Sequence, residues 1–378
     1  MFFHWFLLRV FTVALFLGSS LAWANDTLEI EEHIRNKQWT QAQQKLQSAI
    51  KQSTAKPGSA VSPQLRLMNS QILAGLGQSA KAVEELLTLI QEFPELPEPY
   101  NNLGVLYAAQ GNYDAAMTAF GRRSGDGDEH LRVGAIKLFV DGGFTGPAAY
   151  TRKPYQGMGD YRGSLTMPAA AIHDTLRTAH RAGWQIGVHA IGDAAIDLAV
   201  ESLADVLRET PRADHRHYLN HFTLLPDTET LAAMARNGIA ITQQPNFTYT
   251  LEGRYMTYLE GTTLETNNPL RTPLNHGIHL ALSSDILPIG PTVGLYAAVT
   301  RQGRSGRVFG PEERIAMIDA LRGYTIRGAW LTREEHLKGT LEAGKLADFI
   351  ILNENPLLVP EAEILQLRVE ETWLGGQQ

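Results

Sequence analysis

Four side chains that could bind a metal ion or move a proton share one setting in the second half of the sequence. Each lies within or directly after a short apolar segment, where the strands of α/β enzymes carry their catalytic groups. The four residues are Lys137, His189, His221 and Asp285. Imidazole nitrogen and carboxylate oxygen are common ligands of divalent metals. The chain has no cysteine, which excludes disulfides, thiolate zinc sites and cysteine nucleophiles, so a metal must be held by His, Asp, Glu or a modified Lys.

The apolar segments that carry these residues predict five buried strands. The segments span 135–140, 184–189, 218–222, 238–243 and 278–284. Helical patterns cover residues 169–182 and 193–208, between consecutive segments. Apolar strands that alternate with helices are typical of a parallel sheet covered on both faces. We therefore expect a βα barrel, with its chemistry at the carboxyl ends of the strands.

Each of the four candidates also has a purely structural interpretation. His189 and His221 could be core histidines with satisfied hydrogen bonds. Lys137 could be a strand lysine paired with a carboxylate, and Asp285 could cap a loop. The residue types and their spacing leave these alternatives open.

Two neighbours of the candidates are expected to have other roles. Asp193 is interpreted as the N-cap of a helix over 194–208 and not as a catalytic acid. His217 lies four residues before His221, which is ~13 Å along a strand. That distance is too long for one shared metal, so His217 is expected to face solvent.

Residues 25–120 show helical periodicity and resemble tetratricopeptide repeats. The small and large positions of the repeat are matched by Tyr100, Leu103, Gly104, Tyr107, Gly111, Tyr113, Ala116 and Phe120. Ala82 lies 34 residues before Ala116, which is the length of that repeat. A generic amphipathic helix pair would need only an apolar stripe and no small residues at fixed offsets. The resemblance implies helical hairpins and a surface for a protein partner.

The helical region is followed by a glycine-rich segment. Three glycines between residues 121 and 128 predict a linker over 121–130. Across the whole chain of 378 residues, Lys and Arg total 33 and Asp and Glu total 40, a formal net charge of −7. A net negative charge does not indicate a basic surface for binding nucleic acid, so we do not expect a nucleic-acid partner.

The first 24 residues have the layout of a secretion signal. Arg9 precedes the apolar run Val10–Leu17, and the sequence AWA at 22–24 fits a cleavage site. A membrane anchor is the alternative, but the apolar run is shorter than the ~20 residues of a span. We expect cleavage after Ala24, a secreted or periplasmic mature protein, and no stable membrane span.

Five segments between residues 131 and 376 resemble, in order, the carboxyl-terminal half of a metal-dependent amidohydrolase of family three. They are VGAIKLFVDGG, GVHAIGDAA, HYLNHFTLL, LALSSD and GTLEAGKLADFIILNENPL. The resemblance implies hydrolysis of carbon–nitrogen bonds in small amides, including N-substituted formamides. It assigns a divalent metal, preferably zinc, to His189, His221 and Lys137, the lysine with or without carboxylation. It assigns to Asp285 the transfer of the proton from the attacking water to the leaving nitrogen.

The sequence departs from that family at one important point. The family carries a His-x-His ligand pair on its first strand, and no such pair lies upstream of Lys137. The only His-x-His of the chain is His215–His217, directly before the 218–222 segment. The first three strands of the barrel are therefore expected to be missing, together with two metal ligands.

The expected fold is multidomain. It comprises all-α tetratricopeptide hairpins over 25–120, a partial TIM-like (β/α) barrel with strands four to eight over 131–335, and a short β segment over 336–378. Two functions stay open: an amidohydrolase impaired by the missing ligands, and a protein-interaction scaffold that carries an inactive remnant. A join of two reading frames is a third explanation of the sequence.

Overall fold

The computed structural model describes residues 27–54, 60–94, 96–112, 115, 123–128, 131–285 and 290–378. The chain divides into two compact units, Met1–Gly121 and Arg122–Gln378. The predicted secretion signal over 1–24 lies outside the described residues. Among the helices that are described, none combines the length and the apolar character that a bilayer crossing requires.

The first unit consists of antiparallel helices. A helical segment over 27–35 precedes α2 (Trp39–Ser53), α3 (Pro63–Gly75), α4 (Ser79–Glu92) and α5 (Pro97–Ala109). Each of these four helices packs against the next in sequence. The start of α3 follows from its sequence, because the Ser62 hydroxyl accepts a hydrogen bond from the Leu65 N–H and Pro63 occupies the first turn.

Of the residues that match the repeat, Ala82 and Leu103 are buried, whereas Tyr100, Gly104 and Tyr107 are partly exposed. Other buried residues of this unit are Ala42, Leu46, Ala49, Leu86 and Leu89. The helices α2 and α3 approach so closely that a Cβ on Gly75 would lie 2.3 Å from the Trp39 ring. The helical prediction is confirmed for these residues. The assignment to tetratricopeptide repeats stays a prediction, and Tyr113, Ala116 and Phe120 lie outside the described part of the chain.

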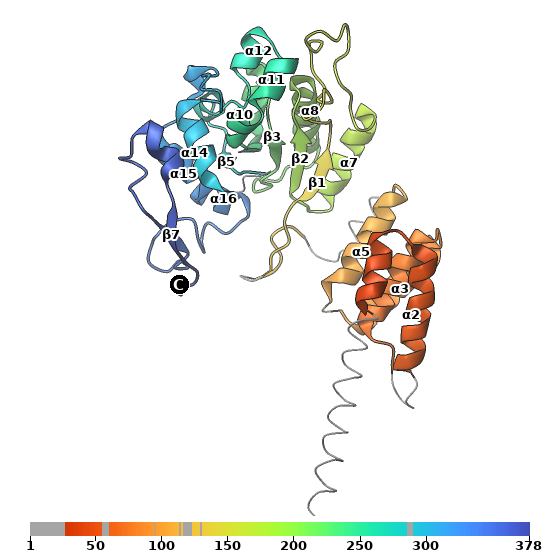
Figure 1. Ribbon diagram of the computed structural model, residues 1–378. Helices are drawn as coiled ribbons and strands as arrows, with labels where there is room; N and C mark the ends of the chain where they lie inside the picture. The colour runs from red at the N-terminus through yellow and green to blue at the C-terminus, as the bar shows by residue number, and fades with distance from the viewer. Residues whose placement is uncertain are drawn as a thin grey trace, which may run out of the picture. The chain divides into compact units, whose positions relative to one another are not determined.

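The second unit is built on a parallel sheet of five strands (Figure 1). The strands are β1 (Ile136–Phe139), β2 (Ile186–Ala190), β3 (Tyr218–His221), β4 (Ala240–Gln243) and β5 (Leu280–Leu282). Their order in the sheet is their order in the sequence, and all neighbouring pairs are parallel. All five predicted segments are confirmed as strands, and the sheet fits a partial TIM-like barrel.

The sheet register separates an apolar row from a polar row. One row across the sheet consists of Leu138, Val188, Leu219, Ile241 and Leu280, and all five side chains are buried. The adjacent row consists of Phe139, His189, Asn220, Thr242 and Ala281. Because successive side chains point to opposite faces of a sheet, the second row lies on the other face. This second row carries polar side chains, whereas the first row is fully apolar.

Helices and short turns fill the connections between and after the strands. The helices are α7 (Ala169–Arg181), α8 (Asp193–Glu209), α9 (Thr228–Asn237), α10 (Asn246–Thr250), α11 (Glu252–Tyr258), α12 (Gly261–Glu265), α13 (Arg271–Asn275), α14 (Pro291–Thr300), α15 (Met317–Tyr324) and α16 (Ile326–Leu331). The 3-10 helices are η1 (Pro311–Glu313) and η2 (Glu361–Gln366). In this unit α7 packs on α8, and α8 packs on β2 and α9.

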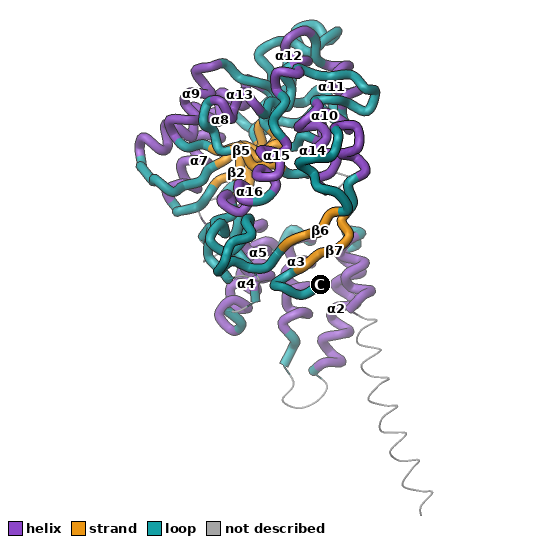
Figure 2. Tube along the Cα trace, turned by 90° about the vertical axis from the view of Figure 1, so that its left-hand side faces the viewer, coloured by secondary structure: helices purple, strands orange, loops and turns teal. Residues whose placement is uncertain are grey.

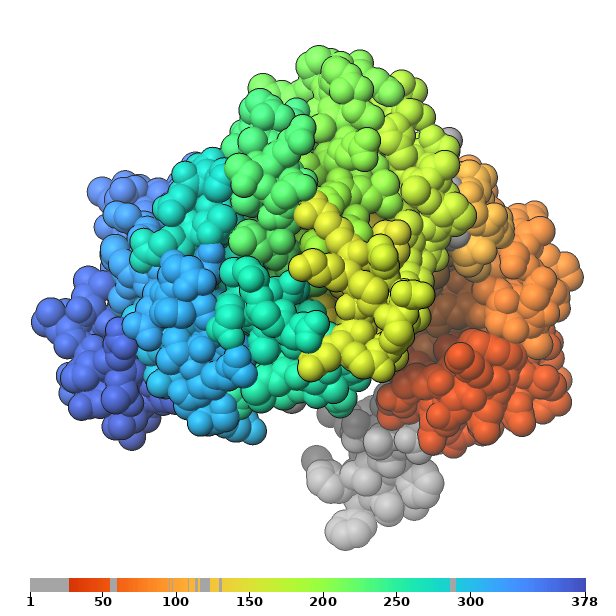
Figure 3. Space-filling view, turned by 90° about the horizontal axis from the view of Figure 1, so that it is seen from above, coloured from red at the N-terminus to blue at the C-terminus, as the bar shows by residue number. Residues whose placement is uncertain are grey.

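The segments that follow β1 and β4 meet beyond the carboxyl ends of the strands. Phe144 and Tyr155 from the first segment pack with Phe247 and Tyr255 from the second in one buried apolar cluster. The Gln156 N–H also donates to the Tyr258 carbonyl oxygen across this contact. In Figure 3 the yellow segment after β1 lies beside the teal segment after β4. These loops therefore form one side of the region where the candidate residues emerge.

Two further features complete this unit. Near the carboxyl terminus, β6 (Phe349–Leu352) and β7 (Val369–Trp373) form an antiparallel pair that is separate from the parallel sheet (Figure 2). Before β1, residues 123–128 pair with residues 131–134 through the Gly127–Arg132 bridge. The Ser124 hydroxyl also accepts a hydrogen bond from the Gln185 N–H. The described part of the expected linker is thus tied to the parallel sheet.

Candidate active site

The two candidate histidines lie side by side at the carboxyl end of the sheet. His189 is in β2 and His221 is the last residue of β3. Their rings meet edge to face, with centroids 4.5 Å apart and an interplanar angle of 67°. His221 is buried and also stacks on Phe247, at a centroid distance of 6.2 Å. The structure therefore brings together two residues that are 32 positions apart in the sequence.

Hydrogen bonds decide which nitrogen of each ring carries the hydrogen. Nδ1 of His221 lies 2.8 Å from the Gln244 Oε1 atom, and an amide oxygen only accepts. Nδ1 of His221 is therefore the donor, and its Nε2 keeps a lone pair. Nε2 of His189 faces the carbonyl oxygen of Gly142 at 3.4 Å and a carboxylate oxygen of Asp141 at 3.7 Å. Since a carbonyl oxygen only accepts, the hydrogen of His189 is on Nε2 and the lone pair is on Nδ1.

Both rings are held in the neutral state. Burial is the main reason why the pKa of His189 is lowered to about 4, and the neighbouring His221 lowers it further. Burial likewise lowers the pKa of His221 to about 4, and the ammonium group of Lys137 adds to this effect. A neutral imidazole has a free nitrogen lone pair, which is the form that binds a metal or accepts a proton.

Lys137 reaches the same region from β1. Its Nζ atom donates to Oδ1 of Asn220, which in turn donates through Nδ2 to the Thr242 hydroxyl at 2.7 Å. Nζ also lies 5.2 Å from the centre of the Phe139 ring. Partial burial lowers the pKa of Lys137, and the carboxylate of Asp285 opposes this shift. The amine is therefore neutral more often than that of a lysine in water.

Asp285 follows β5 and is exposed. Its backbone has a φ of +61°, in the left-handed region that a residue with a side chain rarely adopts. The charge of its carboxylate raises the pKa of both Lys137 and His189. The structure brings the rings of His189 and His221 into contact. Lys137 reaches the neighbouring Asn220 from within β1, and Asp285 is close enough for its charge to act on Lys137 and His189.

Asp141, which directly follows the predicted strand segment over 135–140, is a fifth residue of this region. Its buried carboxylate accepts hydrogen bonds from the N–H groups of Tyr150, Ile191 and Gly192, at 2.9, 3.0 and 2.9 Å. Burial raises the pKa of Asp141 to about 7, although the three N–H groups act against this shift. The carboxylate ties the loop after β1 to the loop after β2, beside Nε2 of His189. No short motif signals this role, because the donors are backbone groups.

The donor atoms fit a divalent metal in part. Two imidazole lone pairs from neighbouring strands are suitable ligands for zinc and similar ions. A catalytic zinc site uses three protein ligands, and the amine of Lys137 would join as an oxygen ligand only after carboxylation. Within the described ranges there is no group of three or more His, Asp or Glu side chains that could hold a metal.

The His-x-His pair directly precedes β3, at the opposite end of the sheet, and the predicted exposure of His217 was wrong. His217 is fully buried, with Nε2 2.8 Å from Nδ1 of His180 and Nδ1 accepting from the Ile186 N–H at 3.0 Å. His215 is also buried; its Nδ1 accepts from the His217 N–H and its Nε2 bonds the Asn237 carbonyl oxygen. Each ring nitrogen thus has a hydrogen-bond partner within the protein, which explains why these two histidines can be buried.

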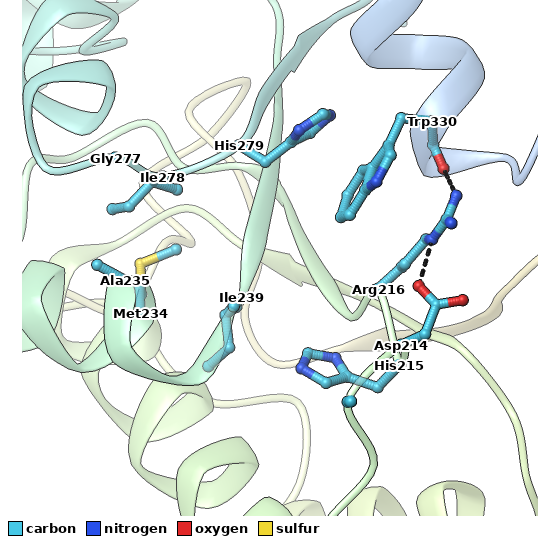
Figure 4. Close-up of a pocket in the computed structure, with 12 residues that line it drawn as sticks. Asp214, His215, Arg216, Met234, Ala235, Ile239, Gly277, Ile278, His279 and Trp330 are labelled. Atoms are coloured by element: carbon cyan, nitrogen blue, oxygen red, sulfur yellow. Dashed lines mark hydrogen bonds and ion pairs between the residues drawn. The ribbon is translucent and has the colours of Figure 1, made fainter. Parts of the chain in front are cut away.

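A small cavity of about 200 Å³ lies next to this pair (Figure 4). His215 and Arg216 line it together with Ile239, His279 and Trp330, which stand before β4, before β5 and on α16. The Arg216 guanidinium is already bonded to Asp214, Glu335 and the Trp330 carbonyl oxygen. This cavity is therefore a structural feature of the amino-terminal side of the sheet and is remote from His189.

The N-cap prediction for Asp193 was wrong by one position. Helix α8 begins at Asp193 itself, and Gly192 is its N-cap. Oδ1 of Asp193 accepts from the Arg152 N–H at 2.8 Å and from the Ala194 N–H at 3.0 Å. The carboxylate has a structural role, as expected, but part of it is to hold the loop after β1.

Comparison with known proteins identifies the family of the chain. The sequence pattern of the amidohydrolase family (Amidohydro_3) matches residues 68–378. The chain belongs to this family. The match begins within α3, so it includes part of the helical unit as well as the whole parallel sheet.

Three similar proteins show how far this relation extends. The Bacillus subtilis protein YtcJ is 29% identical over 254 residues, which cover 66% of this chain and 47% of YtcJ. An N-substituted formamide deformylase from Arthrobacter pascens is 29% identical over 251 residues, covering 65% of this chain and 45% of the deformylase. The crystal structure of a metal-dependent hydrolase from Pyrococcus horikoshii has a TM-score of 0.56 and 22% identity, covering 75% of this chain and 65% of that one.

These comparisons fix the fold and the family. At 22% identity the solved structure shows the shared fold alone. The amidohydrolase-family chain spans about half the length of the curated relatives it matches. The comparisons do not assign the substrates of those relatives to this chain.

Proposed function

We propose that the second unit is a metal-dependent hydrolase of carbon–nitrogen bonds in small, non-peptide amides. Membership of the amidohydrolase family supports the reaction class. The relative named as an N-substituted formamide deformylase supports small N-substituted amides as the substrate class. The observation that carries the proposal is the pair of neutral imidazoles of His189 and His221, whose lone pairs are left free by their own hydrogen bonds.

The proposed metal ligands are Nδ1 of His189, Nε2 of His221 and a carboxylated Lys137. When bound there, a divalent ion such as zinc lowers the pKa of a water molecule and polarises the amide carbonyl. Asp285 accepts the proton of that water and donates it to the leaving nitrogen, so that one water is consumed and an acid and an amine are released.

Metal analysis and an amide panel test the proposal together. The purified chain is expected to bind close to one divalent ion and to hydrolyse some members of a panel of N-substituted formamides and N-acyl amino acids. His189→Asn and His221→Asn should each remove the metal and the turnover. His336→Asn, at an exposed position, is the matched control and should keep both. Metal content well below one ion per chain, together with no turnover, would exclude an active enzyme.

A groove on the first unit supports a second candidate function, an interaction scaffold with an inactive hydrolase remnant. The groove has a volume of about 930 Å³ and is lined by the segment over 27–35, by α3 and by the start of α5. We propose that it takes a peptide segment of a protein partner, as a tetratricopeptide array would. On a peptide array, Gln71→Arg in the groove should abolish binding by the full chain. Gln44→Arg, at an exposed position of α2 that does not line the groove, should leave it unchanged.

We also propose that the chain is exported and cleaved after Ala24. The sequence layout of residues 1–24 supports this. Mass spectrometry of the mature amino terminus, after expression with the native first residues, tests it. A mature chain that begins at Met1 would contradict it.

A further inference from the structure

Strand β3 ends in two consecutive residues with unusual backbone conformations. His221 has a φ of +74° and Phe222 a φ of +50°, and both lie in the left-handed region. For residues other than glycine this conformation is unfavourable. Such a turn persists only where the surrounding structure holds it in place. The contacts that hold it therefore indicate what the turn is for.

Two glutamines bracket this turn: Gln243, the last residue of β4, and Gln244, which follows it. Nε2 of Gln243 donates to the Phe222 carbonyl oxygen at 3.1 Å, and Oε1 of Gln243 accepts from the Gln244 N–H at 2.6 Å. Oε1 of Gln244 accepts from Nδ1 of His221 at 2.8 Å. Both glutamines are buried, with exposed fractions of 0% and 2%. The pair thus binds the backbone of one turn residue and the ring of the other.

The orientation of the Gln244 amide is fixed by its other side. Nε2 of Gln244 donates to the Thr242 carbonyl oxygen at 3.3 Å and to the Ser283 hydroxyl at 2.7 Å. A carbonyl oxygen only accepts, so Nε2 must be on that side and Oε1 must face His221. Ser283 directly follows β5, so the amide connects the ends of three neighbouring strands.

We propose that Gln244 is a positioning residue that selects the Nδ1–H form of His221 and directs its Nε2 lone pair away from the protein interior. The stacking of the ring on Phe247, at an interplanar angle of 9°, limits its rotation. Without an acceptor at Nδ1, a buried N–H would remain unpaired, which is unfavourable. The ring then gains more by moving its hydrogen to Nε2, which removes the lone pair from the site. What that lone pair binds rests on the proposed function, whereas the selection of the ring form does not.

The ring form is measured directly by nitrogen-15 NMR of histidine-labelled full-length protein, free of metal and at pH 8. Wild type should show a protonated Nδ1 and an unprotonated Nε2 for His221. Gln244→Met, which keeps the side-chain length and removes the acceptor, should shift the signal towards the Nε2–H form. Gln244→Glu restores an acceptor and should return the wild-type pattern. Gln156→Met, at an exposed position in the loop after β1, is the control.

A folded Gln244→Met protein that keeps the Nδ1–H form would overturn the proposal. Should that variant fail to fold, Gln244→Glu carries the test, because its His221 must remain in the Nδ1–H form. Zn²⁺ titration of the same proteins gives the second readout. Loss of an outer partner of a metal-bound histidine typically weakens affinity by about 10–100-fold, and Gln244→Met should show this, with recovery in Gln244→Glu. Absence of Zn²⁺ binding by wild type contradicts the proposed function and leaves the NMR result to decide the role of Gln244.

Discussion

The imidazole rings of His189 and His221 lie edge to face with their centroids 4.5 Å apart. Two protonated rings at this distance would repel each other, which is part of the reason why the pKa of His189 is lowered to about 4. We predict that His221→Asn raises the pKa of His189 towards its ordinary value near 6.5 while burial keeps it below that value. NMR titration of the imidazole C–H signals in metal-free protein measures this. His336→Asn is the control, and an unchanged pKa of His189 in His221→Asn would show that the two rings do not interact.

Asp141 should contribute strongly to the stability of the second unit. Its carboxylate accepts three backbone N–H groups in a buried place, and an amide at this position would bring its own N–H₂ towards those donors. We predict that Asp141→Asn lowers the free energy of unfolding by about 2–4 kcal/mol. Urea unfolding followed by the fluorescence of the unit measures it. Asp160→Asn, at an exposed position, should change the free energy by less than about 0.5 kcal/mol.

The three buried histidines at the amino-terminal side of the sheet predict acid sensitivity. Burial lowers the pKa values of His180, His215 and His217, and the nearby Arg212 guanidinium lowers all three further. The folded form keeps these rings neutral while the unfolded chain protonates them below about pH 6.5, so stability is full above that pH and falls as the pH decreases. Each ring contributes a slope of up to about 1.4 kcal/mol per pH unit.

Hydrogen exchange of the amides of β2 and β3 between pH 7 and 5 measures this slope locally, after correction for the intrinsic exchange rate. His180→Gln should make the slope shallower, because the glutamine side chain cannot take up a proton. His173→Gln, at a partly exposed position of the same helix α7, is the control. Equal slopes in wild type and His180→Gln would contradict the prediction.

Lys137 should react with carbon dioxide more readily than a solvated lysine. Partial burial lowers its pKa, and only the neutral amine attacks carbon dioxide to form a carbamate. We predict a carbamate signal in the carbon-13 NMR spectrum of protein incubated with labelled bicarbonate at pH 8. The signal should disappear in Lys137→Met and remain in Lys153→Met, at an exposed site. A spectrum that is the same in wild type and in Lys137→Met would show that Lys137 acts as an amine.

The sequence was sufficient to predict the strands of the parallel sheet and the residues that stand at their ends. Short continuous apolar segments bounded by glycine and polar residues are typical of buried strands. Their length and their flanking residues therefore indicated β1 to β5. Because the carboxyl ends of parallel strands meet at one edge, the strand assignment alone brought His189, His221 and Asp285 together.

The hydrogen-bond partners of these residues were beyond such reasoning. Asp141 binds backbone N–H groups, which every residue except proline has, and Gln244 reaches His221 from the position after β4. His217 was predicted to be exposed because the pattern could not show that His180 on α7 would supply a partner for its ring. In each case the missing information was which distant segment supplies the donor or the acceptor.

The turn at His221 and Phe222 has a consequence for engineering. Two consecutive residues in the left-handed conformation lower the thermal stability of the fold, and in return they hold the His221 ring in one orientation. Laboratory selection for survival at high temperature alone would favour replacements that relax this turn. Variants obtained in that way would have a higher thermal stability. They would lose the orientation of His221 at the carboxyl end of the sheet.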